Sequence, residues 1–329
     1  MRAVVAALAV CAAVSLGACG SRTTTADPDP GPTVSPRTPA ASPVAPSPTS
    51  ATTPPSTPST APSTAPSTAV APTITIPDLP TPDALGPVEG ADVSWPQCPK
   101  GMGIPKKRSE GAPMPLGSAR FVVLGLTNGP GFYPNPCLAD QVAWIRQRHL
   151  MAGAYSVVSY PEKRQFAEFG DQGPFEPRSR LGRLANIGYQ QALFNIRTMQ
   201  SAGLSVPAVW LDVEPVTGFD WPPDVEANAA VVRGAVTAYA DQGLTVGVYS
   251  TATLWQRVVG DLRLSLPEWR AAGETSRAEA LRRCGPDQMF QGGTAVLTQW
   301  VDARRDGSRD RDVTCPGGST YLSLWFHQY

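Results

Sequence analysis

Hydrophobic and polar positions divide this 329-residue chain into two parts. Residues 86–329 alternate short apolar runs, which predict strands, with longer segments of helical periodicity. Residues 161–178, polar and rich in Pro and Gly, are expected to form a loop. The expected strands are 91–94, 120–126, 152–160, 206–211, 244–250, 268–271, 295–301 and 321–327, and the expected helices are 138–149, 181–199, 224–242, 253–259 and 275–283.

This alternation predicts an α/β protein with a mainly parallel sheet, because each parallel strand needs a crossover connection, usually a helix. Eight strands within residues 86–329 also match the usual size of a TIM-like (β/α)8 barrel. The later crossovers are short, so we expect the barrel to be irregular in its last quarter. In barrels of this kind, functional residues gather at the carboxyl ends of the strands.

The expected strand at 206–211 ends in two acids, Asp212 and Glu214, and Pro215 then stops the pairing of the strand. Residues i and i+2 of a strand point the same way, with Cα atoms about 6.6 Å apart. Each carboxylate therefore raises the free energy of ionising the other, so that one can hold a proton while its neighbour stays charged. Acid-catalysed glycoside cleavage requires such a pair. The alternative is a strand end with two solvated acids.

The first residues predict export. Arg2 precedes an apolar segment at 3–14 that is too short for a mature membrane helix, and small residues follow. The tetrapeptide at 16–19 resembles the lipobox of bacterial lipoproteins. That resemblance implies a signal peptide at 1–18 and a mature N-terminal Cys19 carrying acyl chains such as palmitate. Several acyl chains give stable anchoring, so we expect the extracytoplasmic face of the cell membrane. An ordinary secretory signal that leaves Cys19 unmodified is the alternative.

Composition separates residues 19–85 from the rest. This segment is dominated by Pro, Ser, Thr and Ala, so it is predicted to be a disordered tether that cannot bury a core. Residues 86–329 would form the barrel domain. The net charge is zero and the only histidines are His149 and His327, so nucleic acid, a metal and a cofactor are not expected. A monomer is expected.

Four cysteines lie in the expected domain: Cys98, Cys137, Cys284 and Cys315. An even number in an exported domain indicates two disulfides, for which three pairings exist. We favour Cys98–Cys137 and Cys284–Cys315, because each links consecutive segments.

The order of motifs resembles the family 25 glycoside hydrolases, the Chalaropsis-type lysozymes or muramidases. The family's Leu-Asp-Val-Glu is unchanged at 211–214, and its Asp-Val-Ser strand matches 92–94. Departures are Asn128 for an acid, Ser156 for a His, Thr298 for a Trp and Cys98 for a Gly. The other matching segments are 126–129, 153–156, 249–250, 298–300 and 310–313, the last being Asp-Arg-Asp-Val where the family has Asp-Leu-Asn-Val.

This resemblance implies that Glu214 is the general acid and that Asp212 either stabilises the oxocarbenium-like charge or orients a participating acetamido group. Asp92 completes the catalytic acids, and Asp310 holds sugar hydroxyls. The remaining residues expected to bind substrate are Tyr155, Tyr249, Gln299 and Trp300. For the three aromatic residues, ordinary core packing is the alternative.

Three functions remain open from the sequence. The first is a membrane-anchored glycoside hydrolase that cleaves peptidoglycan or a related cell-wall glycan. The second is a protein of the same fold that binds wall glycan without cleaving it, which the lost His and the altered aromatic positions favour. The third is a structural or partner-binding lipoprotein.

Overall fold

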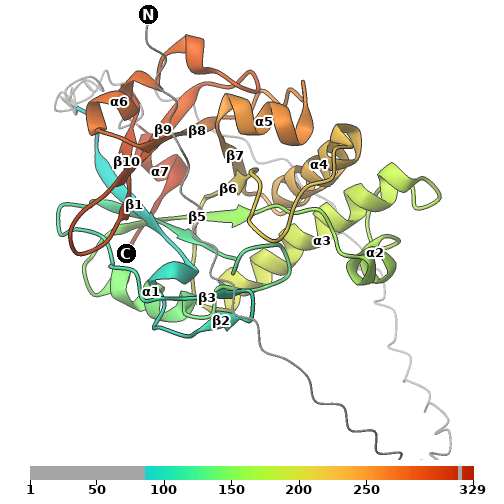
Figure 1. Ribbon diagram of the computed structural model, residues 1–329, viewed down its shortest axis with the longest axis horizontal. Helices are drawn as coiled ribbons and strands as arrows, with labels where there is room; N and C mark the ends of the chain where they lie inside the picture. Colours follow the sequence, from blue (N-terminus) through green and yellow to red (C-terminus); the bar gives the residue numbers. More distant parts are fainter. Residues whose placement is uncertain (1–85, 318–320) are drawn as a thin grey trace, which may run out of the picture. The chain divides into compact units, whose positions relative to one another are not determined.

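The computed structural model describes residues 86–317 and 321–329. Eight of its strands form a closed barrel in which β5, β4, β1, β10, β9, β8, β7 and β6 are neighbours and β6 pairs with β5 again (Figure 1). These strands are β1 (Glu89–Val93), β4 (Phe121–Gly125), β5 (Met151–Val157), β6 (Ala208–Asp212), β7 (Thr245–Ser250), β8 (Glu268–Glu274), β9 (Ala295–Asp302) and β10 (Arg309–Thr314). The predicted α/β barrel is confirmed. The signal peptide, Cys19 and the tether lie outside the described residues, and the predicted domain boundaries stay predictions.

Helices connect most of the parallel strands, as the periodicity predicts. No helix of the described ranges is both long and apolar enough to span a bilayer. The helices are α1 (Leu138–Arg146), α2 (Lys163–Phe169), α3 (Arg180–Ser201), α4 (Val225–Asp241), α5 (Ala252–Val259), α6 (Arg277–Arg282) and α7 (Leu322–Trp325), with short 3-10 turns η2 (Trp95–Gln97) and η3 (Pro286–Gln288). The prediction of a loop at 161–178 was wrong in one part, because this segment contains α2.

The last quarter of the barrel is irregular, as expected. Strand β10 runs antiparallel to both its neighbours, β9 and β1, so one wall of the barrel is a hairpin without a crossover helix. The strand expected at 321–327 was wrong: this segment forms α7, and β11 (His327–Gln328) adds only two residues to the start of β5. Its apolar residues Trp325 and Phe326 are buried against the barrel's interior cluster rather than in a barrel strand.

Strand alternation sends one set of side chains into the barrel, where aromatic rings fill the lower part. Phe121, Trp210 and Trp269 are completely buried there or nearly so. Glycines make room for the rings, since any side chain at Gly90 would overlap Phe121 and any at Gly247 would overlap Trp210. The interior above these rings is left for polar side chains.

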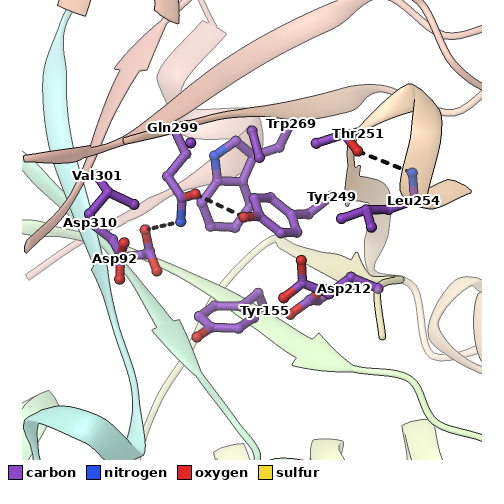
Figure 2. Close-up of a pocket in the computed structure, with 13 residues that line it drawn as sticks. Asp92, Tyr155, Asp212, Tyr249, Thr251, Leu254, Trp269, Gln299, Val301 and Asp310 are labelled. Carbon is purple, nitrogen blue, oxygen red and sulfur yellow. Dashed lines mark hydrogen bonds between the residues drawn. The ribbon is translucent and has the colours of Figure 1, made fainter. Parts of the chain in front are cut away.

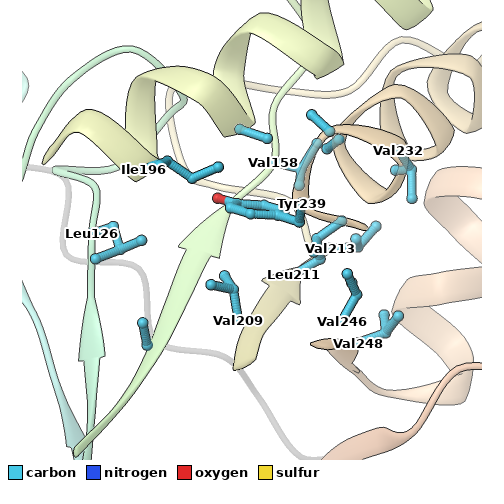
Figure 3. Close-up of a cluster of buried hydrophobic side chains, with 14 of the residues drawn as sticks. Leu126, Val158, Ile196, Val209, Leu211, Val213, Val232, Tyr239, Val246 and Val248 are labelled. Atoms are coloured by element: carbon cyan, nitrogen blue, oxygen red, sulfur yellow. The ribbon is translucent and has the colours of Figure 1, made fainter. Parts of the chain in front are cut away.

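The opposite set of strand side chains packs against the helices. In Figure 3, Val209 and Leu211 of β6 and Val246 and Val248 of β7 face the helices that cover the sheet. The Tyr239 side chain of α4 lies among them, and its hydroxyl hydrogen-bonds Ser156 Oγ at 2.9 Å. This continuous apolar layer fixes which face of each strand points inward.

A small separate hairpin pairs β2 (Gly103–Ile104) with β3 (Lys107–Arg108) after β1. Asn128, at the end of β4, holds it: the Asn128 Oδ1 accepts a hydrogen bond from Ile104 N at 2.6 Å, and its Nδ2 donates to Lys107 O at 3.0 Å. The hairpin is therefore tied to the carboxyl end of the barrel.

Both predicted disulfides are confirmed. Cys98 pairs with Cys137 across 39 residues, and Cys284 pairs with Cys315 across 31 residues. The second lies in a loop that is also held from within, because Arg270 donates to Arg283 O at 2.7 Å and to Gly285 O at 2.6 Å. It joins that loop to the end of β10.

Replacing Cys284 and Cys315 by Ala should lower the free energy of unfolding by about 4 kcal/mol, because the unfolded chain regains the entropy of an open loop. Urea unfolding monitored by Trp fluorescence measures the change. A double variant as stable as the wild type would contradict this expectation.

Candidate active site

Four carboxylates meet in one cavity of about 380 Å³ at the carboxyl end of the barrel. They come from Asp92 of β1, Asp212 at the end of β6, Glu214 two residues beyond it, and Asp310 of β10. The inward face of β6 carries Ala208, Trp210 and Asp212 in turn, so the acid continues the interior column of side chains. Neither Lys nor Arg lines the cavity.

The backbone that carries the acid pair is fixed at three points. Val213 is completely buried on the outer face, its N–H donates to Tyr249 O at 3.1 Å, and its carbonyl accepts from Ser250 Oγ at 2.8 Å. The Trp221 indole then donates to Glu214 O at 3.0 Å. Asp212 and Glu214 are thereby presented side by side with little freedom in the backbone.

A chain of hydrogen bonds orients Asp92 (Figure 2). The Tyr249 hydroxyl donates to Gln299 Oε1 at 2.8 Å, and Gln299 Nε2 donates to Asp92 Oδ2 at 2.8 Å. Beneath them the Trp269 ring lies 4.6 Å from the Tyr249 ring and 5.8 Å from the Tyr155 ring, centroid to centroid. The floor of the cavity is therefore aromatic, with carboxylates above it.

Burial raises the pKa values of all four acids, and the charge of a neighbouring acid raises those of Asp92, Asp212 and Glu214 further. Burial is the main cause for Asp92 and for Asp212, and the charge of Asp310 adds to the first and that of Glu214 to the second. Burial raises the pKa of Asp310 to about 6. The pKa of Glu214 is raised too, in the direction that the sequence predicts, but burial outweighs the charge of Asp310 as the cause. These carboxyl groups therefore hold their protons to higher pH than exposed carboxyl groups do.

The structure brings together seven of the eight predicted site residues. The cavity is lined by Asp92, Tyr155, Asp212, Glu214, Tyr249, Gln299 and Asp310. The prediction that the eighth residue, Trp300, lines the site was wrong. Trp300 is buried with Ala280 and Val313 outside the cavity, and the Arg311 guanidinium lies 4.9 Å from its ring. Gln299 and Trp300 are adjacent in β9, so only one of them can face inward.

Sequence reasoning missed several residues at the cavity. Trp269 lies in the short strand expected at 268–271, and Thr251 and Leu254 lie at the start of the helix after β7. A stricter use of alternation would have found Trp269, because Trp269 and Ala271 share the inward face of β8. Nothing in the sequence indicates that Trp221 binds the backbone of Glu214.

The departures from the family 25 motifs lie away from the cavity. Ser156 faces outward and hydrogen-bonds Tyr239, and Thr298 is completely buried on the outer face of β9. Cys98 is in a disulfide, and Asn128 anchors the small hairpin. None of the four lines the cavity. Among the residues that the structure describes, no group of His, Cys, Asp and Glu side chains has the arrangement of a metal site.

Comparison with known proteins agrees with the motifs. The model of a family described as "Lysozyme-like protein 1" matches residues 182–279, which include Asp212, Glu214 and Tyr249. The chain is 31% identical over 70 residues to "Lysozyme-like protein 5" of Caenorhabditis elegans, and 36% identical over 80 residues to "Probable GH family 25 lysozyme 3" of Dictyostelium discoideum. Over the region that carries the acid pair, the chain is thus similar to lysozyme-like proteins, a probable family 25 lysozyme among them.

The matched regions are short. They cover 21% of this chain and 31% of the nematode protein, and 23% of this chain and 16% of the Dictyostelium protein. A bacterial lysozyme from Streptomyces coelicolor is similar in structure, with a TM-score of 0.47 and 17% identity, over 72% of this chain and 97% of that chain. At these values, the structural likeness carries no information about activity, and the activity of this protein has to be argued from its own residues.

Replacing Asp212 by Asn should change how stability depends on pH. The pKa of Asp212 is raised on folding, so its stabilising contribution is complete below the unfolded pKa, near 4, and is lost as pH rises through the folded pKa. The melting temperature of the wild type should therefore fall from pH 4 to pH 7, and that of the Asn variant should fall less. Thermal unfolding at several pH values measures both, and parallel curves would contradict the expectation.

Proposed function

We propose that this protein is a glycoside hydrolase that cleaves peptidoglycan or a related cell-wall glycan by carboxylate acid catalysis. The observation that carries the proposal is the cavity itself, in which Asp92, Asp212, Glu214 and Asp310 converge without a cation. The names of the matched relatives support the substrate class. The departures from the family motifs at Cys98, Asn128, Ser156 and Thr298 lie outside the cavity.

Glu214 is proposed to be the general acid. Its raised pKa keeps a proton on the carboxyl group, which it donates to the leaving glycosidic oxygen as the bond to the anomeric carbon breaks. Asp212 is proposed to face the positive charge that develops on the sugar ring, and Asp92, oriented by Gln299, adds negative charge on the same side. Tyr155, Tyr249 and Trp269 provide rings on which a sugar can stack.

A glycan-binding protein without hydrolytic activity is the second candidate. The raised pKa values of all four acids favour it, because protonated carboxyl groups can also act as hydrogen-bond donors and acceptors for sugar hydroxyls. Binding without cleavage by the wild type would decide for this function.

We also propose that the protein is anchored to the extracytoplasmic face of the cell membrane through acyl chains on Cys19. The lipobox-like tetrapeptide at 16–19 supports this, and the Pro-rich segment that follows suits a spacer between membrane and wall.

Glu214→Gln should reduce glycan hydrolysis by a factor of about 10² or more, since the amide keeps the size of the side chain but has no proton to deliver. Reducing-sugar release from purified cell wall measures the loss, and a wall-binding assay should show retained binding. Wild-type activity should fall as pH rises through the raised pKa of Glu214.

The matched control is Glu226→Gln, the same change at an exposed position in the first turn of α4, which should leave activity unchanged. Full activity in Glu214→Gln would show that the assignment of the acid is wrong.

Cys19→Ala should release the protein from the membrane fraction of the producing cells, because the acylated side chain is lost. Cys11→Ala, inside the predicted signal peptide, is the control and should stay with the membranes. Fractionation followed by immunoblotting distinguishes them, and membrane retention of Cys19→Ala would refute the lipid anchor.

A further inference from the structure

Asp312 is a buried acid below the cavity that the proposed mechanism does not use. It lies on the inward face of β10, two residues from Asp310, and is completely buried. Its Oδ1 accepts a hydrogen bond from Trp269 Nε1 at 2.8 Å. No N–H or neutral hydroxyl group of the described residues reaches its Oδ2, although that atom is shielded from solvent.

The group that meets Asp312 is another carboxyl, that of Asp92. In the pairing of β1 with β10, Gly90 lies opposite Asp312, so Asp92 follows two residues on along the same inward face. Asp92 and Asp312 are thus diagonal neighbours on adjacent strands, and their carboxyl groups hydrogen-bond. Two ionised carboxylates have no proton with which to form such a bond, so one of them must be protonated.

The surroundings determine which acid holds the proton. Asp92 is 6% exposed, borders the cavity and accepts from Gln299, whereas Asp312 is completely buried with Trp269 as its one neutral donor. The other titratable groups that face the pair are Asp310, Asp212 and Glu214, with the hydroxyls of Tyr155 and Tyr249. The charges near the pair are therefore all negative, which opposes ionisation of both members.

We propose that Asp312 and Asp92 share one proton, with Asp312 as the protonated member, so that Asp312 is a positioning residue that holds the Asp92 carboxylate at the cavity floor. The family motif has Asn at the place of Asp312, and an Asn amide would donate the same hydrogen bond without titrating. This chain thus has a titratable donor under its active site. The effect of Asp312 on catalysis rests on the proposed hydrolase function, whereas the shared proton does not.

Proton release on unfolding tests the shared proton directly. The full-length wild type at pH 7 should release about one proton more than Asp312→Asn, because the unfolded acids are ionised while the folded pair keeps one proton. The double variant Asp92→Asn, Asp312→Asn should show the same difference of about one, because it lacks the same single proton and Asp92 contributes none of its own. Calorimetric unfolding in buffers of different ionisation enthalpy gives these counts.

Two outcomes would overturn the proposal. Equal proton release by the wild type, Asp312→Asn and the double variant would mean that the pair holds no proton, and a difference of about two for the double variant would mean that each acid holds its own. Asp261→Asn, an exposed acid at the end of α5, is the matched control and should release as many protons as the wild type.

Carboxyl carbon NMR of the aspartate-labelled wild type gives a test that needs no variant to fold. If one proton is shared, the resonances of Asp92 and Asp312 should titrate in two common steps. Independent single-step titrations would contradict the shared proton.

Hydrolysis then tests the positioning role. Asp312→Asn should keep activity within about twofold, whereas Asp312→Leu should lose about tenfold or more, because the charged Asp92 loses one hydrogen bond. Rescue by Asn but not by Leu distinguishes positioning from a general loss of stability, and equal activity of the two variants would exclude it. If the wild type cleaves no glycan, the proposed function is wrong. The number of protons released on unfolding would still show whether Asp92 and Asp312 share a proton.

Discussion

The closure of the sheet between β5 and β6 is the constraint on which the site depends. In a closed barrel every strand has one inward face and one outward face, and the interior is narrow enough for side chains from all sides to meet. Aromatic rings fill the lower part, with Gly90 and Gly247 leaving the space that the rings need. Acids occupy the next positions on the same strand faces, so they come together from β1, β6 and β10 without any long loop having to fold over them.

Bringing these carboxylates together opposes folding, because ionised carboxylates repel one another when buried. The same crowding raises the pKa values on which the proposed acid catalysis depends. Burial makes ionisation unfavourable, and each remaining charge makes the next one harder to form, so the pKa values rise together. The protein compensates with fixed donors: Gln299 for Asp92, Trp269 for Asp312, and Trp221 for the backbone of Glu214. Asp212 Oδ1 is buried without a donor among the described residues.

Each change relative to the family 25 motifs can be explained by whether its position faces into the barrel or away from it. Ser156, Thr298 and Cys98 have structural roles in the outer layer or in a disulfide, and Asn128 holds a hairpin. Asp312 is different, because it replaces an amide by an acid directly beneath Asp92. Divergence in this chain is therefore concentrated outside the cavity, with one change that alters the proton balance of the site itself.

The sequence by itself determined the alternation of strands and helices, the pairing of the cysteines and the acid pair at the end of β6. These features depend on local periodicity and on neighbours in the chain. The tertiary structure decided that β10, and not the segment at 321–327, completes the barrel, because pairing partners are chosen by which apolar faces can be buried together. It also decided that Gln299 rather than Trp300 reaches the cavity, and that Asp312 meets Asp92, since such contacts join residues more than 200 positions apart and only closure of the barrel brings them within reach.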